Sequence, residues 1–137
     1  MGRVIVSFNV SNNADLAMFE AGLLPPEKIR RVAIQGAVDT AANHLVLPAS
    51  VVQHLGLRTP TEARVRYADQ STAIRPIAEN VAVELLGRSS VFRAVVEPDR
   101  STALIGAIVL EDLDLLVDCG KQELYPRDPE RVISEVE

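Results

Sequence analysis

Residues 32–57 read VAIQGAVDTAANHLVLPASVVQHLGL, and this stretch decides the fold prediction. Asp39 and Thr40 end one apolar run, the small residues Ala41 and Ala42 follow, and a second apolar run begins. An aspartate at a strand end is ordinarily a turn former whose carboxylate accepts hydrogen bonds from nearby backbone amides. Because both flanks are apolar, we expect this loop to lie inside the fold. An acid in that position must be hydrogen-bonded, paired or catalytic.

The flanks of this loop predict short elements. Residues 29–40 indicate a pair of strands with a turn at residues 35–36. Residues 44–48 indicate another short strand, and Pro48 then begins a helix that Gly56 ends as the residue after its last turn. The stretch therefore reads as strand, small-residue loop, strand and helix.

Elsewhere, short runs alternate between apolar and polar residues, which is typical of strands. Asn12 or Asn13 can cap a short helix that runs through Glu20. The other predicted elements are a strand at 4–10, a three-stranded meander over 62–97 with turns at Asp69-Gln70 and Gly87-Arg88, a break at Gly106, a helix at 109–113, and strands at 114–118 and 123–125. We predict an all-β fold, a barrel or sandwich, with one or two short helices.

Composition limits the possible functions. The chain has 137 residues, which fits one domain, and its net charge of −5 disfavours nucleic acid as a partner. The single Cys119 cannot form an internal disulfide, which suits a reducing cytoplasm, and the chain has no zinc pattern. The N-terminal apolar run is too short for a signal sequence or a membrane span. We therefore expect a cytoplasmic protein that needs no metal or other cofactor and has no membrane or nucleic-acid partner.

Two segments resemble one known family. VDTAANHLVLPASVVQHLGL, residues 38–57, and ALIGAIVLEDLDLLVD, residues 103–118, resemble the two motifs of retropepsin-like aspartic proteases, the clan AA enzymes related to retroviral proteases. The similarity is to the bacterial single-domain kind and covers nearly the whole chain. It implies a closed retropepsin-like acid-protease barrel over residues 1–126, followed by a polar C-terminal tail at residues 127–137.

The resemblance also implies a chemistry. Each chain of such a protease supplies one acid, and a homodimer brings two together, so that the paired carboxyls share one proton and activate a water that attacks the peptide bond. Carried over, Asp39 is the catalytic residue of an aspartic endopeptidase acting on a peptide or protein substrate. Thr40, Ala41, Ala42 and Gly106 then support the active loop, with the Thr40 hydroxyl bracing the two loops of the dimer.

The sequence departs from the family pattern in two places. Ala41 stands where the family has glycine, which keeps the amide donor but penalises a positive φ. RYADQSTAIRP, residues 66–76, stands where the family has a hairpin flap over the substrate, with glycine commonly at its tip. The candidate flap and substrate-cleft residues are Tyr67, Ala68, Asp69, Gln70 and Ser71. Because of Ala41, an alternative is a catalytically impaired module of the same fold that only dimerises or binds peptides.

Overall fold

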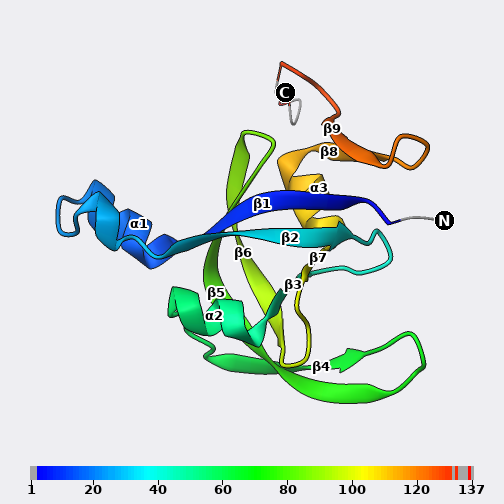
Figure 1. Ribbon diagram of the computed structural model, residues 1–137, viewed down its shortest axis with the longest axis horizontal. Helices are drawn as coiled ribbons and strands as arrows, with labels where there is room; N and C mark the ends of the chain where they lie inside the picture. The colour runs from blue at the N-terminus through cyan, green and yellow to red at the C-terminus, as the bar shows by residue number, and fades with distance from the viewer. Residues whose placement is uncertain (1–2, 131, 133–135, 137) are drawn as a thin grey trace.

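The computed structural model describes residues 3–130, 132 and 136, and its centre is a closed barrel of six strands. The ring runs β1-β2-β7-β3-β6-β5 and closes because β1 pairs with both β2 and β5 (Figure 1). Its strands are β1 (Ile5–Asn12), β2 (Arg31–Val38), β3 (Leu45–Pro48), β5 (Thr72–Leu85), β6 (Arg88–Glu97) and β7 (Ala103–Ile105). The prediction of a mostly β barrel is therefore confirmed.

Three strands lie outside the ring. β4 (Thr61–Arg66) pairs only with β5 and forms a long hairpin with it, at the lower edge of Figure 1. β8 (Leu115–Asp118) and β9 (Glu123–Pro126) form a separate hairpin. β4 is thus an edge strand among the strands that the structure describes.

Two parallel pairings hold the centre of the barrel together. β2 pairs with β7 in the register Gly36↔Ala103 to Val38↔Ile105, and β3 pairs with β6 from Leu45↔Ala94 to Pro48↔Glu97. The remaining pairings are antiparallel. The β2–β7 pair brings the end of β2, where residue 39 follows, next to the end of β7, where residue 106 follows.

The prediction of two strands with a turn between them at residues 29–40 is wrong, because β2 is one continuous strand from Arg31 to Val38. Gly36 is not in a turn but inside the strand, and it is buried. A Cβ atom there would stand 2.8 Å from Cε1 of Phe8, so the glycine leaves room for the aromatic ring on β1. Gly36, which the sequence suggested as a turn residue, is therefore needed for close packing inside a strand.

The helices are α1 (Asn13–Glu20), α2 (Ala49–Leu55) and α3 (Ala107–Leu113), together with the 3-10 turn η1 (Pro26–Lys28). The expectation of one or two helices is therefore too low. Asn12 caps α1, since its Oδ1 accepts from the amides of Ala14 at 2.9 Å and Asp15 at 3.2 Å. Gly56 ends α2 in the left-handed region, as predicted.

The core is almost entirely aliphatic, in keeping with the low aromatic content. Its largest fully buried side chains include Leu45 and Leu47 of β3, Leu55 of α2 and Ile105 of β7. Among them, Ile105 accepts a hydrogen bond from the Asp39 amide, so the loop after β2 starts from a strand that is packed into the core.

The predicted tail at 127–137 lies partly outside the described residues, which omit 131, 133–135 and 137. Its beginning is attached to the barrel. The Arg127 Nε atom lies 2.6 Å from Asp114 Oδ1, and the buried Arg88 guanidinium donates to the carbonyls of Leu113, Asp114 and Asp128. None of the helices in the described part of the chain has the length and apolar character needed to cross a bilayer.

Candidate active site

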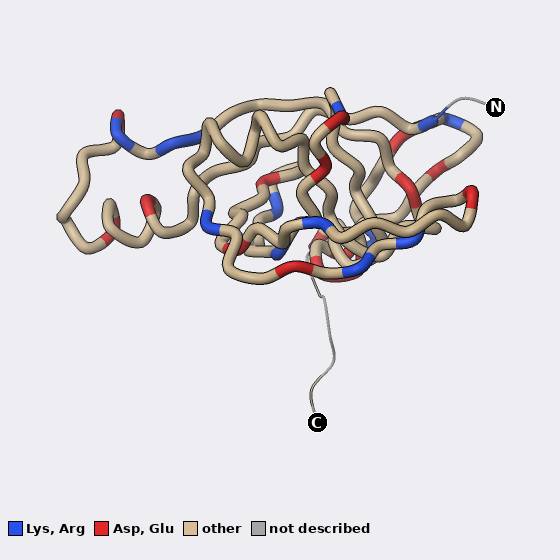
Figure 2. The backbone as a smooth tube through the Cα atoms, turned by 90° about the horizontal axis from the view of Figure 1, so that it is seen from below, with Lys and Arg blue, Asp and Glu red and all other residues tan. Residues whose placement is uncertain are grey.

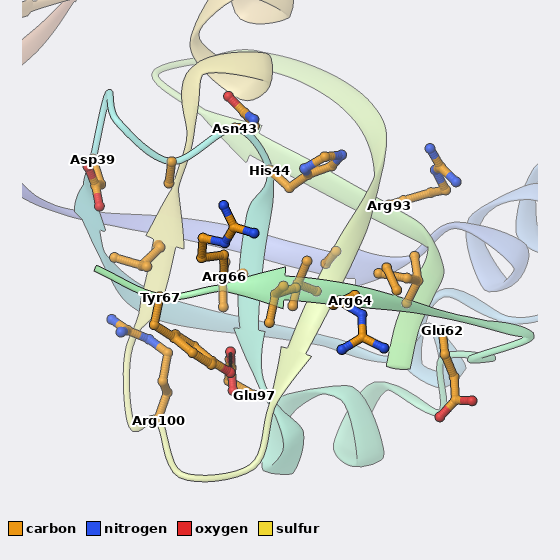
Figure 3. A pocket seen from close by; sticks show the side chains of 18 of the residues that line it. Asp39, Asn43, His44, Glu62, Arg64, Arg66, Tyr67, Arg93, Glu97 and Arg100 are labelled. Carbon is orange, nitrogen blue, oxygen red and sulfur yellow. Dashed lines mark hydrogen bonds between the residues drawn. The ribbon is translucent and has the colours of Figure 1, made fainter. Parts of the chain in front are cut away.

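A cavity of about 1030 Å³ lies between the loop after β2 and the β4–β5 hairpin (Figure 3). Its lining joins segments that are distant in the sequence: residues 39, 41–44 and 46, all of 61–68, Ile77, 93–95 and 97, Arg100 and Leu104. Of the sequence-predicted site residues, Asp39, Ala41, Ala42, Tyr67 and Ala68 line it. The size suits a peptide segment or a ligand of similar bulk.

Asp39 lies where β2 leaves the barrel. Its amide donates to the Ile105 carbonyl at 3.0 Å, and its Oδ1 accepts from the Ala41 amide at 3.0 Å. Asp39 is half-buried, whereas Thr40 and Ala41 are exposed. In the single chain the loop is therefore not buried as expected, and its tip faces outward.

Backbone hydrogen bonds fasten this loop to the start of α3. The Ala107 amide donates to the Ala42 carbonyl at 2.8 Å, and the Ile108 amide donates to the Asn43 carbonyl at 2.9 Å. Gly106 lies behind the loop, where a Cβ atom would stand 2.5 Å from the His44 carbonyl oxygen. These contacts fix the position of Asp39 although the loop tip is exposed.

Ala41 fits its place without backbone strain. Among the described residues, those other than glycine with a positive φ are Gln70, Asn80, Leu86, Asp114 and Gln122, so Ala41 is not one of them. The penalty expected for alanine in place of glycine therefore does not arise in this conformation. The alanine also keeps the amide that hydrogen-bonds to the Asp39 carboxylate.

Tyr67 connects the hairpin to the barrel as well as lining the cavity. Its hydroxyl donates to Glu97 Oε2 at 2.6 Å, and Arg75 Nε lies 3.0 Å from that hydroxyl and 2.8 Å from Glu97 Oε1. Burial, together with the hydrogen bond to Glu97, raises the pKa of Tyr67. This cluster of Tyr67, Arg75 and Glu97 connects the outer part of the hairpin, next to its turn, to the end of β6.

The hairpin tip lies away from the cavity. Asp69, Gln70 and Ser71 are exposed and are not in its lining. The Tyr67 amide donates to the Ser71 carbonyl at 2.9 Å, and Asp69 Oδ1 accepts from the Ser71 amide at 2.9 Å. Hydrogen bonds from the Ser71 side chain and amide lower the pKa of Asp69, and Gln70 takes a left-handed φ of 72°. The tip is a structured turn without glycine.

Sequence reasoning missed the arginines of the cavity. Arg64 and Arg66 come from β4, Arg93 from β6 and Arg100 from the loop after it (Figure 3). The alternation in residues 62–66, Glu-Ala-Arg-Val-Arg, was the available signal, but an exposed strand face gives the same pattern.

The cavity extends along the whole length of β4. Successive side chains of a strand point to opposite faces, yet all eight residues from 61 to 68 line the cavity. The cavity therefore runs along the edge of the strand rather than over one face. The outer edge of β4 has no partner strand among the described residues, so it presents unpaired backbone N–H and C=O groups.

A smaller cavity of about 260 Å³ also borders the loop. Thr40 lines it, together with Asp39, Val4, Val117 and Cys119 among others. Asp39 therefore borders both cavities. In the described part of the chain, no three or more His, Cys, Asp or Glu side chains gather as metal ligands would.

No known protein family matches this chain, and no curated protein matches it either. The function is therefore inferred from the site itself.

Proposed function

We propose that the protein is an aspartic endopeptidase in which Asp39 and its copy in a second, identical chain activate a water molecule. The observation that carries the proposal is the position of Asp39. Its carboxylate lines a peptide-sized cavity that is bounded on the far side by the free edge of β4. An extended peptide can pair with such an edge through its backbone and lie across the acid.

The active loop supports this chemistry. Its backbone is fixed by hydrogen bonds to β7 and α3, so a carboxylate at residue 39 needs little reorganisation to act. One carboxyl of the pair takes a proton from the water while the other, protonated, polarises the scissile carbonyl. The hydrogen bond from the Ala41 amide holds the Asp39 carboxylate in a fixed orientation.

The proposal requires a homodimer, because each chain offers one such acid. The exposure of Thr40 and Ala41 leaves the loop tip accessible to a second copy. In that dimer the Thr40 hydroxyl would brace the two loops.

The exposed, unpaired Cys119 suits a reducing compartment, and we place the protein in the cytoplasm.

The test compares Asp39→Asn with Asp112→Asn, an exposed acid on α3. Digestion of denatured casein is followed from pH 3 to 8, and mass in solution is measured for each protein. We expect a bell-shaped pH profile on the acidic side and a dimer for the parent and for Asp112→Asn. Asp39→Asn should remain a dimer and lose cleavage. Cleavage by Asp39→Asn at the parent rate, or by a strictly monomeric parent, contradicts the proposal.

A peptide-binding or dimerisation module is the second candidate, because the edge of β4 and the cavity need no catalysis to bind a peptide. The variant Ala41→Gly distinguishes the two functions. A large gain in cleavage means that the parent is an impaired enzyme. Peptide binding without cleavage in either form favours the module.

A further inference from the structure

The large cavity is a positively charged region of an acidic protein. Four arginines and three carboxylates line it, whereas the chain as a whole has a net charge of −5. Along the backbone as a whole, acidic and basic residues are interspersed (Figure 2). A cleft lined by an excess of one sign attracts ligands of the other sign.

Three of the four arginines are available to a ligand. The exposed side chains of Arg64, Arg66 and Arg93 form no hydrogen bond or ion pair with any other residue in the part of the chain that the structure describes. Arg100 is engaged, since its Nε donates to the Thr102 carbonyl at 3.0 Å.

Two of the three carboxylates do little to neutralise these arginines. Glu97 is already bound by Arg75 and by the Tyr67 hydroxyl. Asp39 belongs to the proposed catalytic pair. Only Glu62 remains, and it lies at the opposite end of β4 from Arg66. The part of β4 from Arg64 to Arg66 is therefore positively charged.

We propose that the cleft selects acidic peptides, with Arg64, Arg66 and Arg93 as its specificity-determining residues. This inference builds on the proposed endopeptidase function and names its substrate class. Guanidinium groups bind carboxylates through paired hydrogen bonds, which suits glutamate and aspartate side chains. The free strand edge favours a peptide over a nucleic acid, because an extended peptide offers matching backbone donors and acceptors.

The spacing on β4 predicts a sequence pattern. Arg64 and Arg66 are two residues apart on one strand, so their Cα atoms lie about 7 Å apart on the same face. An extended peptide beside β4 has the same period. Acidic side chains at alternate positions of the peptide would therefore meet both arginines, while the position beside Glu62 would disfavour an acid.

Two synthetic fluorescent peptides test this inference. Both carry a central Leu-Phe pair, and the flanking alternate positions hold Glu in one and Gln in the other. Affinity for the Asp39→Asn variant is measured at pH 6 by fluorescence anisotropy, so the reading needs no cleavage. The Glu peptide should bind about tenfold more tightly than the Gln peptide, an advantage that 1 M NaCl removes.

The variant Arg64→Gln/Arg66→Gln, made in the same background, should lose most of the preference, because only Arg93 of the three arginines remains. The matched control Arg31→Gln/Arg58→Gln changes two exposed arginines outside the cavity and should keep the preference. Equal binding of the two peptides to Asp39→Asn itself overturns the inference. So does a preference that survives 1 M NaCl, or one that the Arg64→Gln/Arg66→Gln change leaves undiminished.

A single-stranded DNA oligonucleotide of the same charge is measured in parallel. Tighter binding of the oligonucleotide than of the Glu peptide overturns the peptide assignment in favour of nucleic acid. Cleavage of both peptides by the parent is followed separately. A binding preference without any cleavage would support the inference while the endopeptidase proposal fails.

Discussion

Gly106 lies so close to His44 that a Cβ atom on the glycine would stand 2.5 Å from the His44 carbonyl oxygen. The same atom would stand 2.8 Å from the Ala42 carbonyl oxygen. Both contacts are with backbone, which cannot swing aside as a side chain can. The loop that carries Asp39 therefore depends on the absence of a side chain at residue 106.

Gly106→Ala should displace the loop and destabilise the fold. We expect a loss of about 1–3 kcal/mol in the free energy of unfolding, as for other overpacked sites. Urea denaturation measures it. Gly120→Ala is the control, because its nearest contact would be the Asp118 side chain at 3.3 Å, and it should change stability little. Equal stabilities for the two variants would show that the loop adapts without cost.

Tyr67→Phe should loosen the hairpin from the barrel. The change removes the hydroxyl that bonds to Glu97 and Arg75 while it keeps the ring. We expect a loss of about 1 kcal/mol in stability. Amide hydrogen exchange in residues 61–76 should be faster than in the parent. Tyr125→Phe, at an exposed tyrosine on β9, serves as the control. Unchanged exchange in the hairpin would mean that the hydroxyl does not hold it.

Gln70→Gly should stabilise the hairpin tip. Gln70 has a φ of 72°, a conformation that costs a non-glycine residue roughly 1–2 kcal/mol. The greater freedom of glycine in the unfolded chain offsets about 0.5–1 kcal/mol of this gain. A rise in melting temperature is therefore expected, and Gln70→Ala should show none. A fall in melting temperature for the glycine variant would show that the left-handed backbone conformation of Gln70 does not destabilise the parent.

Asp15 should contribute to stability in a pH-dependent way. Its side chain accepts from Arg30 Nε at 2.9 Å and Nη2 at 3.0 Å, and these hydrogen bonds lower the pKa of Asp15 below its ordinary 3.8. The folded state thus binds this proton less readily than the unfolded state does. The contribution is complete above about pH 4 and is lost as the pH falls further.

Asp15→Asn tests this pH dependence. The variant should be less stable at pH 6 by roughly 1–2 kcal/mol. The difference from the parent should shrink between pH 4 and pH 2, as measured by urea denaturation at each pH. Glu20→Gln changes an exposed acid on the same helix and should follow the parent. A difference that is constant with pH would exclude titration of Asp15 as its cause.

The local elements could be predicted because their signals lie within a few residues. Asn12 caps α1 through amides two and three residues further on, and Gly56 ends α2 by its own left-handed φ. The hairpin turn near residues 69–70 likewise depends on neighbouring residues. Gly36 shows the limit, because its close contact is with Phe8 on another strand, and the sequence alone suggested a turn.

The sequence by itself determined a mostly β fold, most of the short elements and the candidacy of Asp39, since these follow from periodicity, turn residues and the resemblance of two motifs. Only the tertiary structure decided the parallel β2–β7 pairing that sets Asp39 beside Gly106, and the arrangement of Arg64, Arg66 and Arg93 around one cavity. The physical reason is that contacts between distant segments depend on how whole faces pack, and no short stretch of sequence records its partner in that packing.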